Sequence, residues 1–276
     1  MTDGPTFAPA PRLDHDRYCD EIVEQTRLLR RTLGGTDLSA RVPTCPDWSL
    51  RELAVHVGGA HRWVHEIVRT RATEEVAEDT APGFHGPRGG TPDDLDAWLA
   101  SGAEQLAEAL RDAGAAAEVW TWVPQQSSGF WARRMTHETV VHRADASGAA
   151  ADTTTYRVAA DLAADCIEEW LDLLTLASAD DPGMHDLRRH AGHSLLLHAT
   201  DTPEGGSGDD AAWTISLGPA GIRWRRARSS ATVTVRGPLT DVMRVLHRRL
   251  PPDAGPVEVL GDAGLLHFWL DRTRWA

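Results

Sequence analysis

The sequence has no lysine, because all 28 of its basic residues are arginine. We interpret this bias as the coding preference of a GC-rich genome and attach no function to it. The basic residues are outnumbered by 41 acidic ones, which gives a net charge of −13. Since nucleic acids bind to basic faces, this balance argues against a nucleic-acid partner.

Long apolar runs are also missing. No stretch approaches the ~20 apolar residues that a membrane-spanning helix needs, so no membrane partner is expected. The opening MTDGPTFAPAPRLDHD lacks the positive segment and apolar core of a secretory signal. We therefore expect a cytoplasmic protein whose residues 1–12 form a disordered leader.

Cysteine is scarce. The three cysteines are widely spaced and form no C-x-x-C pair, which argues against a disulfide framework. We expect Cys19, Cys45 and Cys166 to be buried free thiols, with Cys45 packed in a loop.

What the chain does contain is a helical hydrophobic pattern over its first two thirds. Ser49 and Glu52 have the spacing of a capping box, which specifies one helix start. We interpret Gly58 and Gly59, inside that helix, as a sign of close packing against a neighbour. The expected helices cover residues 13–33, 50–70, 91–113, 131–146 and 156–177. Their short or medium connections favour an antiparallel bundle over residues 13–178.

Beyond residue 178 a polar linker, which we expect to be sensitive to protease, precedes a change of period. Residues 194–276 then predict a separate α+β domain. Its expected strands are 194–200, 212–217, 221–225, 231–235 and 257–259, and its expected helices are 239–250 and 261–272.

The segment around Glu138 and His142 offers a candidate site. These residues stand four apart in a predicted helix, so both project from one face. That face also carries apolar residues and is expected to point inward, where unpartnered polar groups are costly. A Glu–His hydrogen bond inside a bundle would satisfy them. A metal would do so as well, with His56 of an earlier helix as third ligand.

Two imidazoles and one carboxylate leave a coordination position open, as in catalytic zinc sites. The same set suits Fe(II), Ni(II) or Mn(II), and ligand type does not choose among them. His61 and His65 form another pair four residues apart. With charged neighbours beside them, we expect them on a solvated or rim face.

Two stretches, VPTCPDWSLRELAVHVGGAHRWV and FWARRMTHETVVHRADA, resemble the mycothiol-dependent maleylpyruvate isomerase family. So do the later pieces HATD, VTVRGP, VEVLGD and FWLDR. The resemblance implies a DinB-like antiparallel four-helix bundle with an extra helix. It also implies a small C-terminal α+β domain of sterol-carrier type.

By this resemblance the ligands of a divalent metal, with zinc expected, are His56, Glu138 and His142. Asp145 lies three residues past His142 and could hydrogen-bond its imidazole, or simply end the helix. His137 is expected to pack beside the site or to support a ligand. Four arginines could bind an acidic substrate at the domain junction, with Arg272 and Arg143 preferred over Arg223 and Arg225.

The activity implied is that of an enzyme that uses mycothiol, a low-molecular-weight thiol, on a small electrophilic substrate. Family isomerases add the thiol to a cis double bond, let the resulting single bond rotate, and expel the thiol. Other members resemble thiol S-transferases. Two alternatives stay open: a non-haem Fe(II) oxygenase, which uses the same ligand set, and a non-catalytic metal- or thiol-sensing protein.

Overall fold

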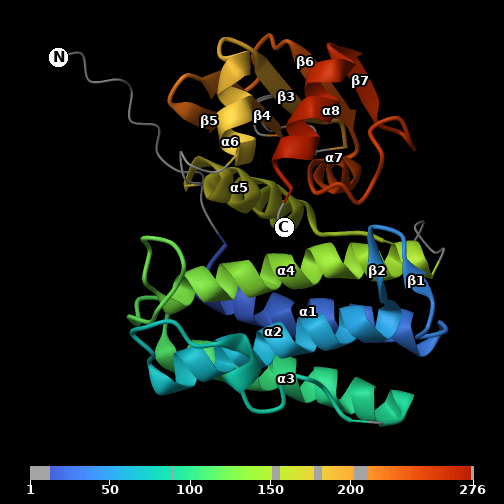
Figure 1. Ribbon diagram of the computed structural model, residues 1–276, viewed down its shortest axis with the longest axis vertical. Coiled ribbons are helices and arrows are strands. Elements are labelled where there is room, and N and C mark those ends of the chain that lie inside the picture. The colour runs from blue at the N-terminus through green and yellow to red at the C-terminus, as the bar shows by residue number, and fades with distance from the viewer. Residues whose placement is uncertain (1–12, 89, 151–155, 177–181, 202–210, 275–276) are drawn as a thin grey trace. The chain divides into compact units, whose positions relative to one another are not determined.

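The computed structural model describes residues 13–88, 90–150, 156–176, 182–201 and 211–274 (Figure 1). The described chain forms two compact units, one ending at Tyr156 and the other beginning at Arg157. The expected leader over residues 1–12 lies outside the described residues. No helix within the described ranges is both long and apolar enough to span a membrane.

The first unit is a four-helix bundle, as expected (Figure 1). Helix α1 packs against α3 and α4, and α2 packs against the same two helices. A single turn of 3-10 helix, Glu78–Thr80, lies between α2 and α3. The four helices are α1 (His15–Gly34), α2 (Leu50–Thr70), α3 (Pro92–Ala113) and α4 (Ser128–Ala149).

Helix α2 begins where its caps dictate. The Ser49 side chain accepts from the backbone N–H of Glu52, and the Glu52 carboxylate accepts from the N–H of Ser49. This reciprocal capping box satisfies two N–H groups that a helix start would otherwise leave unbonded. Thr91 and Asp94 form the same arrangement at α3. Both helix starts confirm the sequence prediction.

The glycine pair in α2 marks close packing, as expected. A Cβ on Gly58 would lie 2.1 Å from Cζ3 of Trp98 on α3. One on Gly59 would lie 2.9 Å from the carbonyl oxygen of Phe84. The absence of side chains here therefore allows α3 and the loop before it to approach α2.

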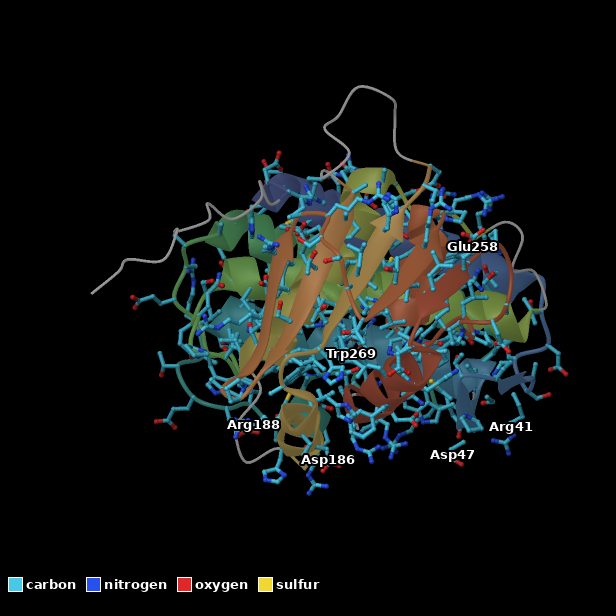
Figure 2. All side chains as sticks on the ribbon, turned by 90° about the horizontal axis from the view of Figure 1, so that it is seen from above. Arg41, Asp47, Asp186, Arg188, Glu258 and Trp269 are labelled. Atoms are coloured by element: carbon cyan, nitrogen blue, oxygen red, sulfur yellow. The ribbon has the colours of Figure 1, made fainter. Side chains whose placement is uncertain are left out.

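The segment before α2 was expected to be a loop, and this was wrong. It forms a small antiparallel hairpin of β1 (Arg41–Val42) and β2 (Cys45–Ser49). Pro43 and Pro46 each lack an N–H, so the pattern reads as loop, and only a short irregular ladder can form. Arg41 and Asp47 of this hairpin point away from the bundle (Figure 2).

The second unit is built on a five-stranded sheet of order β5-β4-β3-β6-β7. Strands β3 and β6 run parallel, and the other neighbours are antiparallel. The helices pair as α5 with α7 and α6 with α8, and Trp269 of α8 is fully buried (Figure 2). The strands are β3 (Ser194–Ala199), β4 (Ala212–Gly218), β5 (Gly221–Arg226), β6 (Val233–Gly237) and β7 (Glu258–Gly261). The helices are α5 (Ala160–Leu176), α6 (Pro182–Leu187), α7 (Leu239–Leu246) and α8 (Ala263–Arg272), with a 3-10 turn at Arg188–His190.

The unit boundary differs from the expected one near residue 178, because α5 groups with the second unit. Helix α5 packs on α7 and β5. Glu168 of α5 accepts a hydrogen bond from Nε1 of Trp213 at 2.9 Å and pairs with Arg226 at 2.8 Å. These contacts from β4 and β5 neutralise a buried carboxylate. Much of the expected linker is outside the described residues or forms α6.

The cysteines carry no disulfide. Cys19 and Cys166 are buried free thiols, as expected, whereas Cys45 is only partly buried. Cys45 packs against the core cluster around α2, including Leu50 and Leu53. This placement agrees with a packing role in the hairpin.

Candidate metal centre

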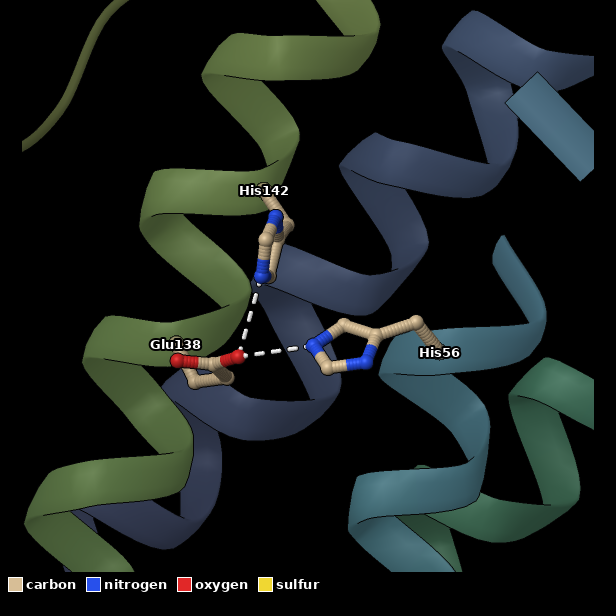
Figure 3. Close-up of side chains that lie close together, drawn as sticks. All are labelled: His56, Glu138 and His142. Carbon is tan, nitrogen blue, oxygen red and sulfur yellow. Dashed lines mark hydrogen bonds and ion pairs between the residues drawn. The ribbon is translucent and has the colours of Figure 1, made fainter. Parts of the chain in front are cut away.

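Three side chains from two helices converge on one point between α2 and α4 (Figure 3). Oε1 of Glu138 lies 3.1 Å from Nε2 of His56 and 3.0 Å from Nε2 of His142. The candidate ligand atoms all lie within 4.8 Å of one another. Among the described residues, His56, Glu138 and His142 form a group of three histidine and acidic side chains that are spaced as metal ligands.

The helices explain this convergence. Glu138 and His142 are one turn apart on α4, so their side chains emerge from the same face. His56 reaches them from the second turn of α2. Deeper between the same helices, Nε2 of His61 hydrogen-bonds Oγ1 of Thr139 at 2.9 Å. This buried link fixes how α2 and α4 lie against each other at the site.

The geometry fits a small divalent cation. A four-coordinate zinc with bonds of roughly 2.0–2.2 Å holds its ligand atoms about 3.3–3.6 Å apart. The two nitrogen–oxygen distances at Glu138 are close to that spacing. Each residue offers one ligand atom, and three protein ligands leave a position for another molecule.

Asp145 supports His142 from behind. Its Oδ2 lies 2.8 Å from Nδ1 of His142, and its Oδ1 accepts a hydrogen bond from the hydroxyl of Thr44 in the hairpin. Because Nδ1 faces a carboxylate, it carries a proton and donates, which leaves Nε2 directed at the candidate site. Of the two sequence interpretations of Asp145, the geometry agrees with support of the imidazole.

The electrostatics favour charged forms here. Burial opposes ionisation of Glu138, but the charge of His142, hydrogen bonds from His142 and His56, and the charge of Arg134 together hold its pKa well below the usual range. Burial likewise lowers the pKa of His142, yet Glu138 and Asp145 outweigh it and raise that pKa to about 9. Without a metal, His142 is therefore an imidazolium that donates to two carboxylates.

The hairpin places an aromatic ring over the site, which sequence reasoning missed. The ring of Trp48 lies 4.8 Å from that of His56 and 6.1 Å from that of His142, tilted by about 40° to both. Trp48 and Thr44 both come from the segment expected to be a plain loop. No spacing rule connects that segment with α4, so the sequence carried no signal for either contact.

Arg134 was also missed, although a signal was present. It precedes Glu138 by one turn of α4, and its NH2 donates to Oε2 of Glu138 at 2.9 Å. The same four-residue spacing that identified Glu138 and His142 would have predicted this pair. Glu138 is thus contacted on both oxygens, by imidazoles on one and by a guanidinium on the other.

The other predicted residues lie elsewhere. His137 is buried and packs edge-on against Tyr18 of α1, with ring centroids 6.1 Å apart. Arg143 stacks over the ring of Tyr156, 4.5 Å from its centroid, within the first unit. Arg272 belongs to the second unit. A gathering of these arginines around a substrate stays a prediction.

Arg272 is engaged within its own unit. Its Nε donates to Asp186 of α6 at 2.9 Å, and its guanidinium lies over Phe268 (Figure 2 labels Asp186). Arg225 donates to Ser229. The expectation for His61 was wrong, since its side chain is fully buried rather than on a rim. His65 is partly buried, as a rim position implies.

Comparison with protein families agrees with this architecture. The family model described as Mycothiol maleylpyruvate isomerase N-terminal domain matches residues 19–147. The one described as MDMPI C-terminal domain matches residues 161–268. The unit boundary after Tyr156 lies between the two matched regions. The chain has a helical bundle that carries the candidate metal site, followed by an α+β unit, and it belongs to the mycothiol-dependent maleylpyruvate isomerase family.

Solved structures support the fold. A crystal structure of the mycothiol-dependent maleylpyruvate isomerase aligns with a TM-score of 0.53 at 15% identity, and a histidine-to-alanine mutant aligns with 0.54 at 16%. In both comparisons the alignment covers 90% of this chain and 93% of the other. No curated protein matches the chain significantly. These likenesses confirm the predicted fold class.

Proposed function

We propose that this protein is a divalent-metal-dependent, mycothiol-dependent enzyme that acts on a small electrophilic, acidic substrate. The reaction is a cis–trans isomerisation like that of maleylpyruvate isomerase, or a transfer of the thiol to the substrate. The observation that carries the proposal is the convergence of His56, Glu138 and His142 with one ligand atom each. The choice of mycothiol as the thiol is supported by membership of the family.

In this proposal the three converging residues hold the metal, with zinc preferred. A divalent metal would supply Lewis acidity and so make a thiolate available near neutral pH. The chain's own residues prepare the site for it. Asp145 keeps the Nδ1 proton of His142 in place, and Thr44 anchors Asp145. The ring of Trp48 lies beside both imidazoles and gives this edge of the site an aromatic wall.

For an isomerase, the balance of the reaction is simple. The thiolate adds to an activated cis double bond, the new single bond rotates, and expulsion of the thiolate restores the double bond in the trans form. The thiol is regenerated, and no net oxidation occurs. An S-transferase would stop after the addition, or would displace a leaving group from the substrate. The proposed cytoplasmic location agrees with a thiol that must stay reduced.

The test is turnover by the metal-loaded protein. Maleylpyruvate and related electrophiles should be converted with mycothiol, and more slowly or not at all with glutathione. Full activity in the absence of any thiol would refute the mechanism. The metal-free protein is the control and should be inactive with every thiol.

An alternative activity is that of a non-haem Fe(II) oxygenase, because two imidazoles and a carboxylate are also the ligands of such enzymes. Substrate-dependent oxygen uptake by the Fe(II)-loaded protein would favour that activity. If the protein binds metal and thiol but converts no electrophile, a sensing role gains support. The helical-bundle scaffold and the family match favour the thiol-dependent enzyme over both.

A further inference from the structure

The carboxylate of Glu138 is held in an asymmetric way. Oε1 faces both imidazoles, at 3.1 Å and 3.0 Å. Oε2 accepts a hydrogen bond from Arg134 at 2.9 Å. The two oxygens of the carboxylate thus have different partners. Oε1 points into the candidate metal centre, and Oε2 points to the guanidinium of Arg134.

This arrangement is built to persist. Arg134 and Glu138 lie one turn apart on α4, so the backbone itself fixes their separation. The Arg134 side chain keeps only 12% of its surface exposed and that of Glu138 22%, which limits screening by solvent. Arginine does not lose its proton in proteins, so Oε2 keeps a charged donor at every working pH.

A carboxylate can bind a metal through one oxygen or through both, and the choice decides how many positions remain. With both oxygens bound, Glu138 and two imidazoles would supply four donor atoms. With one, they supply three, and a position stays open for another molecule.

We propose that Arg134 is a positioning residue that restricts Glu138 to binding the metal through Oε1 alone, so that a coordination position remains free for the thiol. This inference rests on the proposed metal centre. It does not depend on which substrate is converted.

A simpler role for Arg134 would be to neutralise a buried carboxylate. That role predicts a loss of stability when Arg134 is removed, with no change in coordination. The experiment therefore reads coordination directly, on the full-length protein loaded with Co(II). Four-coordinate Co(II) absorbs visible light more strongly than five-coordinate Co(II), and a bound thiolate adds a charge-transfer band in the near ultraviolet.

Two variants separate the roles. Arg134→Met removes the donor and keeps much of the side-chain volume, whereas Arg134→Lys keeps a charged donor. Arg30→Met is the matched control. It removes an arginine whose guanidinium donates to both oxygens of Asp96, joining α1 to α3. Elemental analysis and thermal unfolding establish metal load and folding for each protein.

We expect Arg134→Met to bind Co(II) with a weaker visible band, because Oε2 joins the metal. Its affinity for 2-mercaptoethanol, read from the charge-transfer band, should fall about 10-fold, the size typical for loss of a residue that orients a metal ligand. Arg134→Lys should resemble the wild type, as should Arg30→Met.

An unchanged spectrum and thiol affinity in Arg134→Met would overturn the inference, as would a complete loss of metal at saturating Co(II). A wild-type protein that binds no metal would overturn both this inference and the proposed function. A wild-type protein that shows the expected spectra but converts no electrophile would refute only the proposed function.

Discussion

Helix α2 meets its two neighbours through seams of opposite character. Toward α4 it presents His56, which meets a carboxylate and stays partly exposed, with 38% of its side-chain surface open. Toward α3 it presents Gly58, against which the ring of Trp98 packs too closely for any side chain. One helix therefore has a polar, accessible contact with α4 and a close-packed contact with α3.

The α3 seam also holds a charge, in Arg62. Its guanidinium lies 4.0 Å above the Trp98 ring centroid and donates to the carbonyl oxygens of Gly58 and Trp98. Burial lowers the pKa of Arg62 to about 10, so it stays protonated at neutral pH. Among the described residues, its acceptors are carbonyl oxygens and the Ser101 hydroxyl.

The two buried charges differ in the kind of partner that surrounds them. The guanidinium of Arg62 donates to neutral oxygen atoms of α2 and α3, and these hydrogen bonds join the two helices. Glu138 instead has three hydrogen-bond partners, and two of them are imidazoles whose Nε2 atoms face the same carboxylate oxygen. Charged groups that converge in this way are typical of functional sites.

The largest effect is expected from removing the candidate ligands between α2 and α4, which we call the α4 seam. His56→Ala, Glu138→Gln and His142→Ala should each abolish binding of about one divalent metal per chain. A neutral amide is a poorer ligand than a carboxylate, so the glutamine variant should fail although its shape is kept. Elemental analysis measures the load, and stoichiometric metal in all three variants would refute the site.

The wild type should also lose stability on chelation. A metal that binds only the folded state stabilises it by about 2.7 kcal/mol at 100 times its dissociation constant. Arg62→Met is the control for the α3 seam. It should lower stability but retain the metal.

A second prediction uses the buried histidine of the α4 seam. Burial, followed by the charge of Arg62, lowers the pKa of His61 to about 4 from its usual 6.5. Between about pH 4 and pH 6.5, His61 is therefore protonated in the unfolded chain but neutral in the folded protein. Stability should be constant above about pH 6.5 and fall as pH drops toward 4, by up to about 3 kcal/mol from this residue.

His61→Gln keeps a donor for Thr139 but does not titrate. The unfolding free energies of wild type and variant are measured without metal, in chemical denaturant, at pH 7.5 and pH 5. Subtracting one protein from the other removes the contribution of the other titrating groups, which both proteins share. The variant should lose less stability on acidification. Equal losses would show that His61 is protonated without penalty.

A third prediction tests the close-packed seam. Gly58→Ala places a methyl group 2.1–2.9 Å from three atoms of the Trp98 ring, a contact that requires the ring or α3 to move. We expect a loss of about 1–3 kcal/mol in unfolding free energy, as overpacked cores show. Gly148→Ala on α4 is the control, since a Cβ there meets nothing within 4 Å. Unchanged stability in Gly58→Ala would contradict the packing argument.

Much of this molecule follows from the sequence for identifiable reasons. Helix starts were predictable because caps are local, as at Ser49 and Thr91. The His56–Glu138–His142 cluster was predictable because helical spacing and family resemblance agree on it. His61 was misjudged from its charged neighbours, although its spacing from Val57 and Val64 places it on the buried stripe.

What escaped prediction depends on contacts between distant segments. Helix α5 has an apolar stripe like the others, and a stripe does not say which partner buries it. Its place in the second unit follows from contacts such as Glu168 with Trp213 and Arg226. The contacts of Thr44 with Asp145 and of Trp48 with His142 likewise connect the hairpin to α4, about one hundred positions later in the chain.

The last and smallest prediction asks whether the α4 seam depends on the hairpin. Thr44 donates to Asp145, which in turn holds the imidazole of His142, so the hydroxyl lies two hydrogen bonds from the candidate metal. Thr44→Val keeps the shape and removes that donor. Asp145 then loses one anchor, and His142 is less well oriented. We expect metal affinity, measured by competition with a chelator, to fall about 10-fold, or about 1.4 kcal/mol. Thr36→Val removes a comparable hydroxyl, bonded to the carbonyl of Thr32, and should leave affinity unchanged. If the two variants bind metal equally well, the hairpin covers the site without supporting it.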